Sequence, residues 1–204
     1  MSAQGFTYDP FDHNVTVVGS AGGGKTYFTL WLILKFLIPA GVDFVVWDYN
    51  HRGYDSLPVP KIHTYDAKTA PKQCVYQPYD KSEKAFIAFC KAVFTSNKVV
   101  IIEEAQEYFT KQHMPEEANH LIRTGRNFGV CYIAVTQRPQ EMHTAVLSNS
   151  MHLFVFKLTY PPDVDLLVKW VGEELRNIKA LPLHNFYYRN KYADAPIVMK
   201  AVTI

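Results

Sequence analysis

The feature that most constrains this chain is a glycine-rich segment between a β-branched run and a helical run. Asn14–Val18 has the content of a strand, and Lys25–Leu37 has helical length with an apolar face. The segment between them fits G-x-x-x-x-G-K-[ST] at every fixed position. Its residues are Gly19, Ser20, Ala21, Gly22, Gly23, Gly24, Lys25 and Thr26. A strand, a tight loop and a helix in this order predict an α/β fold with a ligand site at the loop.

The residue types of this loop suit the chemistry of a triphosphate. Glycines let the backbone curl with its N–H groups pointing inward, and the start of the helix adds unpaired N–H groups and partial positive charge. The Lys25 ammonium then reaches the β- and γ-phosphates, and the Thr26 hydroxyl can bind Mg²⁺. A dinucleotide-binding loop needs glycines at i, i+2 and i+5, and neither Gly19 nor Gly22 begins such a set. The loop therefore predicts binding of ATP or a similar nucleotide together with Mg²⁺.

Two acids follow a second apolar run. Val99–Ile102 is continuously apolar, as expected of a strand buried on both faces, and Glu103 and Glu104 come directly after it. Because ligands bind beyond the carboxyl ends of parallel strands, we expect both carboxylates beside the phosphate loop. Side chains alternate along a strand, so Glu103 is expected to bind in the Mg²⁺ shell and Glu104 to orient or deprotonate the attacking water. The alternative is a solvated acidic strand end.

A glutamine and three arginines follow later in the chain. Gln137 comes directly after the strand-like run Val130–Thr136, where its amide could contact both the γ-phosphate and the water, as a sensor of hydrolysis. A plain loop glutamine is the alternative. Arg123, Arg126 and Arg138 are expected near this region, and an arginine from a neighbouring subunit can raise the rate of hydrolysis by roughly 10³–10⁵. Ordinary surface arginines remain the other interpretation.

The rest of the chain alternates strand-like and helix-like runs. This pattern predicts a mostly parallel sheet with helices on both faces, in a single domain over residues 1–204. Further strands are expected at Val42–Asp48, Ile62–Tyr65, Val75–Gln77 and Leu153–Leu158, and a closing C-terminal hairpin at Phe186–Arg189 and Ile197–Val202. Helices are expected at Ser82–Thr95, capped by Ser82, at Glu116–Thr124, ended by Gly125, and after Pro161 and Pro162. The segment Tyr49–Lys72 is irregular.

Charge and composition limit the partners. The formal net charge is +2, far from that of a non-specific DNA coat, so any nucleic acid contact must be local. Three scattered cysteines argue against a disulfide framework or a zinc site. We see no signal peptide, and the longest apolar run is too short to span a bilayer, so a soluble, cytoplasmic protein is expected.

The motifs in their order carry a resemblance to a known family. The chain resembles the FtsK–HerA superfamily of DNA-pumping ATPases through four motifs, which are, in order, GSAGGGKT, VVIIEEAQ, RTGRNFGV and VTQRP. The loop alone is specific only for nucleotide binding; the two glutamates with the later Thr-Gln-Arg-Pro point to this superfamily. The compact form is similar to the genome-packaging ATPases of icosahedral viruses with internal membranes, and the metal-side acid, usually Asp, is here Glu103.

The resemblance implies a fold, partners and residue roles. It implies a RecA-like (ASCE) sheet, a homo-oligomeric ring of five or six subunits and double-stranded DNA in the central channel. It implies ATP and Mg²⁺ at Lys25 and Thr26, Glu103 and Glu104 as the Walker B pair and Gln137 as the sensor. Arg126 is the first choice for the arginine acting in a neighbouring subunit, and Arg123 the second. A viral capsid vertex or membrane-associated packaging proteins would supply the docking platform, in the host cytoplasm or at the virion vertex.

Other functions remain open at this point. A small-molecule kinase shares the phosphate loop but needs an arginine-rich lid, and a DNA translocase of the conjugation type would share the motor without packaging. A GTP-dependent switch needs Asn-Lys-x-Asp, and Asn97-Lys98 is followed by Val99-Val100. The chain could also be a structural protein that retains a phosphate loop without its function, and the acids and Gln137 would then occur beside the loop by coincidence. For DNA contacts, the segment Tyr49–Lys72 carries His51, Arg52, Lys61 and Lys68 and is either a channel loop or a solvated loop.

Overall fold

A nine-stranded sheet forms the centre of the molecule in the computed structural model, which describes residues 2–3, 6–51, 53–94 and 96–204. The strand order is β11-β10-β9-β3-β8-β7-β4-β6-β5. The strands from β9 to β5 run parallel, and β10 and β11 pair antiparallel at one edge as the predicted hairpin. The bounds are β3 (Val15–Val18), β4 (Phe44–Trp47), β5 (Lys61–Ile62), β6 (Gln73–Tyr76), β7 (Val99–Ile102), β8 (Cys131–Thr136), β9 (His152–Phe156), β10 (Phe186–Asn190) and β11 (Ile197–Met199).

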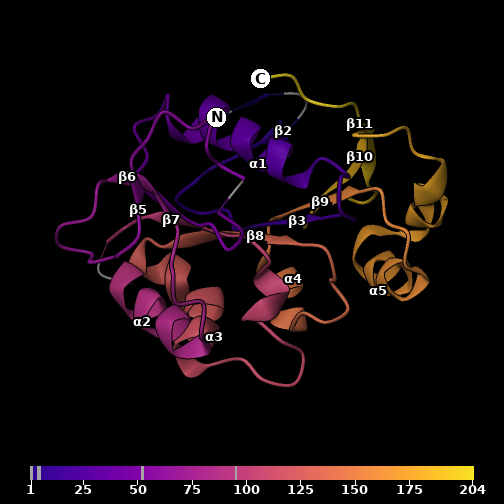
Figure 1. Cartoon of the computed structure of the whole chain (residues 1–204). Coiled ribbons are helices and arrows are strands. Elements are labelled where there is room, and N and C mark those ends of the chain that lie inside the picture. The colour runs from indigo at the N-terminus through magenta and orange to yellow at the C-terminus, as the bar shows by residue number, and fades with distance from the viewer. Residues whose placement is uncertain (1, 4–5, 52, 95) are drawn as a thin grey trace.

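Helices cover both faces of this sheet, as predicted. Helix α1 (Lys25–Leu32) lies on one face, and α2 (Glu83–Val93), α3 (Glu116–Thr124), α4 (Thr144–Asn149) and α5 (Pro161–Val171) lie on the other (Figure 1). Neighbouring residues of one strand point to opposite faces, so Val100 packs in the core under α2 and α3 while Ile101 packs in the core under α1. The sheet is therefore buried on both sides, which explains the unbroken apolar runs in the sequence.

The strand order positions the functional residues. Strand β8 lies between β3, which leads into the glycine-rich loop, and β7, which ends at the two glutamates. These strands are parallel, so their carboxyl ends meet at one edge of the sheet. The loop after β3, Gln137 after β8 and the acids after β7 are thus brought side by side, as the sequence predicts.

Several element boundaries differ from the sequence-based prediction. The helix expected over Lys25–Leu37 is α-helical to Leu32 and π-helical over Ile33–Leu37. Helix α3 ends at Thr124 with Gly125 as its C-cap, as predicted, but a 3-10 turn over Gly125–Phe128 follows at once, and the left-handed residue is Gly129, with φ 72°. The last predicted residue of the helix over Ser82–Thr95 lies outside the described residues, and so does Arg52. Ser82 caps α2 as predicted, accepting a hydrogen bond from the Ala85 N–H at 3.3 Å.

Short elements escaped the sequence patterns. The strands β1 (Ser2–Ala3) and β2 (Phe6–Thr7), the helix α4 and the 3-10 segment Glu173–Ala180 were not predicted. Each of the two strands has only two residues, and α4 has six, which is too few for a period to be read.

A buried histidine near the amino ends of the strands makes folding sensitive to acid. His152 is fully buried, and its Nε2–H donates to His13 Nδ1 at 2.9 Å while its Nδ1 accepts from the Tyr188 hydroxyl at 2.9 Å. His13 Nδ1 also accepts from the Asp9 N–H, so it is an acceptor for His152 as well. His152 therefore has one nitrogen that donates and one that accepts, as a neutral imidazole ring does. Burial, and then the His13 ring, lower the pKa of His152 from 6.5 to about 3.

We expect the free energy of unfolding to fall as the pH drops from 6.5 toward about 3, because the unfolded chain then binds a proton at His152 that the folded chain does not. The slope from this residue is roughly 1.4 kcal/mol per pH unit. Urea unfolding at several pH values would measure it. His152→Gln should be less stable at neutral pH but should lose less stability on acidification than the native chain; parallel pH profiles would contradict this assignment.

Candidate active site

The glycine-rich loop packs tightly against the neighbouring strand. A Cβ at Gly19 would lie 2.6 Å from the Cβ of Phe156, at the end of β9, so only glycine fits there. Gly24 directly precedes α1 and has φ 106°, a backbone conformation that residues with a side chain rarely adopt. The Ser20 N–H donates to the Lys157 carbonyl at 2.9 Å, which ties the loop to the segment after β9. The loop is thereby held in a curled shape at the start of a helix.

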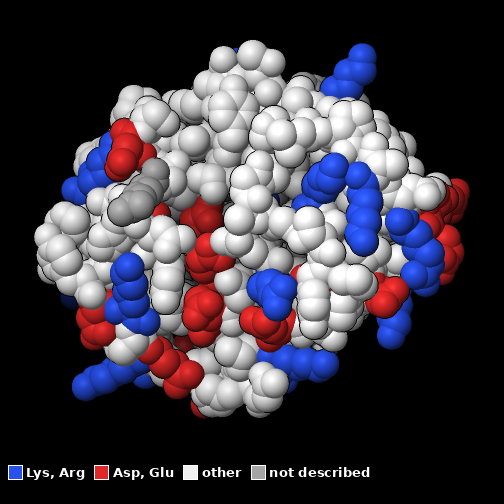
Figure 2. All heavy atoms as spheres, turned by 45° about the vertical axis from the view of Figure 1, so that its right-hand side comes forward, with Lys and Arg blue, Asp and Glu red and all other residues white. Residues whose placement is uncertain are grey.

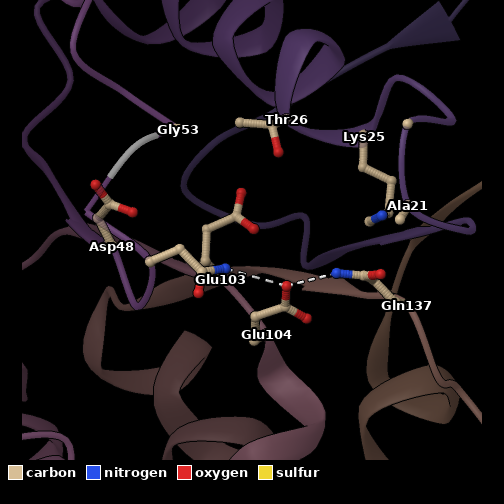
Figure 3. A pocket seen from close by; sticks show the side chains of 10 residues that line it. Ala21, Lys25, Thr26, Asp48, Gly53, Glu103, Glu104 and Gln137 are labelled. Carbon is tan, nitrogen blue, oxygen red and sulfur yellow. Dashed lines mark hydrogen bonds between the residues drawn. The ribbon is translucent and has the colours of Figure 1, made fainter.

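Lys25 is the cation of the site. Its side chain is buried, and its ammonium donates to the Ser20 carbonyl at 3.2 Å. Burial lowers the pKa of Lys25, and the carboxylates Glu103 and Glu104 oppose this shift. Lys25 and Thr26 line the same cleft, of about 1010 Å³, as the two acids and Gln137, and their side chains face it together (Figure 3).

Glu103 is buried behind the loop. The Tyr54 hydroxyl donates to its carboxylate, and its backbone N–H donates to the Trp47 carbonyl at 3.2 Å. The pKa of Glu103 is raised to about 7, chiefly because the carboxyl group is buried. The Tyr54 hydrogen bond and the Lys25 charge lower this pKa, and the charges of Glu104 and Asp48 raise it. Its carboxylate points toward the space below the Thr26 hydroxyl (Figure 3).

Glu104 has a different set of partners. One carboxylate oxygen accepts from the Gln137 amide at 2.6 Å and from Asn50 at 3.3 Å, and the other accepts from Gln106 at 2.7 Å. The backbone of Glu104 has φ 49°, a left-handed conformation unusual for this residue type. Such strain costs about 1–3 kcal/mol and persists where the surroundings impose it, often at functional sites. The hydrogen bonds hold this carboxylate at the open side of the cleft.

The groups at the cleft fit a magnesium ion. The Thr26 hydroxyl and the Glu103 carboxylate are oxygen donors facing one space, and oxygen is the ligand type that Mg²⁺ prefers. Among the described residues no cluster of three or more His, Cys, Asp and Glu side chains could hold a metal by itself. Mg²⁺ is usually held by one or two carboxylates together with substrate phosphates, so this donor set suits an ion that arrives with a nucleotide.

The arginines do not gather at the site of their own chain. Arg126 lies at the amino end of β8, 3.5 Å from the Asp12 carboxylate, whereas Gln137 follows the carboxyl end. A six-residue strand separates the two ends by roughly 20 Å. Arg123 is on α3 and donates to the Asn119 side chain at 2.7 Å. Only Arg138 lies near the cleft, over the Tyr160 ring at 4.4 Å, so the expectation that all three arginines lie near Gln137 is wrong.

Sequence reasoning missed four polar residues that shape the site. Asp48 and Asn50 follow β4 and line the cleft, Gln106 holds Glu104, and Tyr54 holds Glu103. Asp48 is buried and accepts from the Gln77 amide at 3.0 Å. The rule used for the acids after β7, that polar residues after a strand face the site, also applies to Asp48 after β4. No local pattern marks Tyr54, whose contact depends on the irregular segment after Asn50.

Comparison with known proteins decides the fold family. The chain superposes on the genome packaging NTPase from Sulfolobus turreted icosahedral virus 2 in complex with ATP-gammaS with a TM-score of 0.83, at 19% identity, over 96% of this chain and 100% of that one. The chain has a RecA-like P-loop ATPase fold. The same P-loop ATPase fold occurs in VirB4 of Thermoanaerobacter pseudethanolicus, with a TM-score of 0.73 at 10% identity, over 97% of this chain and 93% of that one.

Sequence comparison adds one further relative. A probable helicase of Methanocaldococcus jannaschii is 29% identical over 154 residues, which are 71% of this chain and 29% of the relative. The chain thus spans less than a third of that protein. No family model matches the sequence. The likeness predicted from the motifs, to packaging ATPases of the FtsK–HerA type, is confirmed at the level of the fold.

Proposed function

We propose that this chain is a Mg²⁺-dependent ATPase that moves double-stranded DNA as a ring-shaped homo-oligomer and packages a viral genome into a preformed capsid. The observation that carries the hydrolytic part is the shared cleft, in which Lys25 and Thr26 face Glu103, Glu104 and Gln137. The packaging part is supported by the likeness in fold: the TM-score is 0.83 for the viral packaging NTPase, against 0.73 for VirB4 and 0.65 for EssC from Geobacillus thermodenitrificans.

Each side chain of the cleft has a chemical task in this proposal. The loop N–H groups and Lys25 bind the triphosphate, and Thr26 and Glu103 hold Mg²⁺, which would neutralise charge on the β- and γ-phosphates. Glu104 accepts a proton from the attacking water, and the Gln137 amide, 2.6 Å from Glu104, positions the carboxylate and the water together. The Gln137 contact also couples Glu104 to β8, so a change at the γ-phosphate can reach that strand.

DNA binding in this proposal is local and electrostatic. In the space-filling view, acidic side chains gather near the middle of one face, with Lys and Arg side chains on both sides (Figure 2). Several of the basic side chains on the right of this view lie close together, and they would offer DNA a local contact (Figure 2). Binding would be salt-sensitive and largely independent of sequence, because phosphates carry no sequence information. No helix in the described part of the chain is long and apolar enough to cross a membrane.

The test is phosphate release from Mg²⁺-ATP, with and without double-stranded DNA, on protein whose oligomeric state is measured by light scattering. We expect release without any acceptor molecule and stimulation by DNA that disappears at high salt. A requirement for a small-molecule acceptor would favour the kinase alternative. Hydrolysis that DNA never affects, at any oligomeric state, would contradict translocation but not the ATPase.

Arg126 provides a prediction about the ring. We expect Arg126→Ala subunits, mixed with native subunits, to inhibit ATP hydrolysis more than in proportion to their share, because each would withdraw an arginine from a neighbour's site. Lys179→Ala, which removes a basic residue from the segment Glu173–Ala180, is the matched control. A loss of activity strictly proportional to the fraction of Arg126→Ala would contradict a role in the neighbouring subunit.

A further inference from the structure

A small cavity lies at the amino end of β9, away from the acidic cleft. It has a volume of about 180 Å³ and is formed by the end of α4, the start of β9, the end of β10 and part of α5, two helices that cover the same face of the sheet (Figure 1). Its walls include Leu147, Ser148, Leu153, Trp170, Arg189 and Lys191. The phosphate loop lies at the other end of the five-residue strand β9, so the two sites are separated by roughly 15 Å.

Strand β10 presents two cations to this cavity. Tyr187 packs in the core under the helices α2 to α5, and residues two apart on a strand share a face. Arg189 and Lys191 continue this alternation at the end of β10, where Arg189 pairs with Leu153 of β9. Both cationic side chains are therefore directed to the face that α4 and α5 cover.

Positive charge in this cavity is not balanced by an acid. Among the described residues that line it there is no Asp or Glu. The Lys191 ammonium donates to the Ser148 carbonyl at 3.0 Å, and the Lys191 backbone N–H donates to the Met151 carbonyl at 2.9 Å. The first of these bonds fixes the ammonium at the cavity wall and uses one of its three donors. Two donors of Lys191 are left for a ligand.

The Arg189 side chain has no partner of its own within the described part of the chain. It is half-buried, and its Nη1 is buried without a hydrogen bond. Two acids of α5 are engaged elsewhere, because Asp163 lies 3.9 Å from Arg138 and Asp165 lies 3.0 Å from Arg176. A buried polar group without a partner costs free energy, and most such groups in native proteins are satisfied. An anion in the cavity would supply the missing acceptors.

We propose that Arg189 and Lys191 bind one phosphate group in this cavity, which we name the phosphate pocket. Its volume is below the roughly 300 Å³ of pockets for organic ligands, so a single tetrahedral oxyanion fits it better than a whole nucleotide. A guanidinium binds two phosphate oxygens at once, and an ammonium adds a point charge. The phosphate group is either free inorganic phosphate or a backbone phosphate of DNA, which present the same chemistry.

Calorimetric titration of inorganic phosphate into the full chain tests the phosphate pocket, with the loop Gly19–Thr26 first filled by a non-hydrolysable Mg²⁺-ATP analogue. We expect one phosphate to bind with a Kd of about 1 mM, as two charge-assisted contacts allow. Arg189→Gln and Lys191→Gln should each weaken this binding roughly 10- to 150-fold. Lys200→Gln is the matched control, because exposed Lys200 follows β11 at the other end of the same hairpin, and it should leave phosphate binding unchanged.

Thermal unfolding gives a second measurement that separates ligand binding from a role in the fold. Arg189→Met keeps an unbranched side chain but removes the uncompensated charge, so without phosphate it should unfold at the native temperature or above it. Phosphate should raise the unfolding temperature of the native chain, relative to chloride at equal ionic strength, and not that of Arg189→Met. Equal stabilisation of both chains by phosphate would overturn the phosphate pocket.

Double-stranded DNA distinguishes the two sources of phosphate, and this part of the test rests on the proposed function. If the pocket holds a backbone phosphate, Arg189→Gln should reduce the slope of log affinity against log salt by about 0.9, and inorganic phosphate should compete with DNA. If it holds free phosphate, Arg189→Gln should lose phosphate binding and keep the DNA affinity.

The outcomes also separate the phosphate pocket from the proposed function. Native chain that binds no inorganic phosphate, together with an unchanged salt slope for DNA in Arg189→Gln, would overturn the pocket. Phosphate binding that Arg189→Gln and Lys200→Gln weaken equally would overturn it as well. Native chain that binds inorganic phosphate as expected but never binds DNA would contradict DNA translocation and support the pocket as a site for free phosphate.

Discussion

Glu104→Gln is expected to abolish ATP turnover while ATP stays bound. The glutamine has the same size, and its carbonyl oxygen can still accept a hydrogen bond from Gln137 or Gln106. An amide cannot take a proton from water at neutral pH, so the general-base contribution, typically 10²–10⁴-fold in rate, is lost. Lys25, Thr26 and the loop, which bind the phosphates in this account, are unchanged. Single-turnover phosphate release and equilibrium ATP binding measure the two halves of this prediction.

The neighbouring turn offers a matched control for this substitution. Glu107 lies three residues further along, in the 3-10 turn Ala105–Glu107, and is exposed. Glu107→Gln changes the same charge in the same segment without touching the cleft and should leave turnover near the native rate. Near-normal hydrolysis by Glu104→Gln would remove the assignment of Glu104 to water activation. Loss of ATP binding in that variant would show that Glu104 acts in binding instead.

Lys25→Ala is expected to remove ATP binding at micromolar concentrations. The Lys25 ammonium is buried beside the loop, and the same cleft holds the carboxylates of Glu103 and Glu104. Removing one partner of a buried charge pair costs about 2–5 kcal/mol, which corresponds to a 30- to several-thousand-fold loss of affinity for the phosphates. Without this cation, the acids also repel the incoming triphosphate.

Titration of Lys25→Ala with Mg²⁺-ATP measures this loss, and Lys35→Ala is the control. Lys35 lies ten residues further on, in the π-helical segment Ile33–Leu37, and is exposed. Its removal changes the net charge equally but should change the affinity little. If Lys25→Ala bound ATP as tightly as the Lys35→Ala control, the phosphates would have to bind elsewhere.

The fold was predictable because its parts repeat a strong local pattern. The loop Gly19–Thr26 is recognisable at every fixed position, and the apolar runs after it have the length of strands buried on two faces. The rule that ligands bind at the carboxyl ends of parallel strands then placed Glu103, Glu104 and Gln137 at one edge. The structure brings these three residues and the loop to one cleft.

Contacts that depend on distant segments were not predictable. Tyr54 reaches Glu103 from an irregular segment, and Asn50 reaches Glu104 across 54 positions of sequence. The arginines were misplaced for a related reason. Arg126 and Gln137 are eleven positions apart in the sequence, but β8 runs between them, so they lie at opposite ends of this strand. Proximity in sequence indicates proximity in space only within one element.

The most direct test is an experimental structure of Glu104→Gln bound to Mg²⁺ and ATP. We expect the triphosphate on the N–H groups of Gly22–Thr26, with Lys25 at its end. We expect the metal between the Thr26 hydroxyl and the Glu103 carboxylate, and a water between the substituted side chain at position 104 and the γ-phosphate. A triphosphate bound away from this loop, or a metal held by other side chains with Glu103 still facing only Tyr54, would contradict these roles.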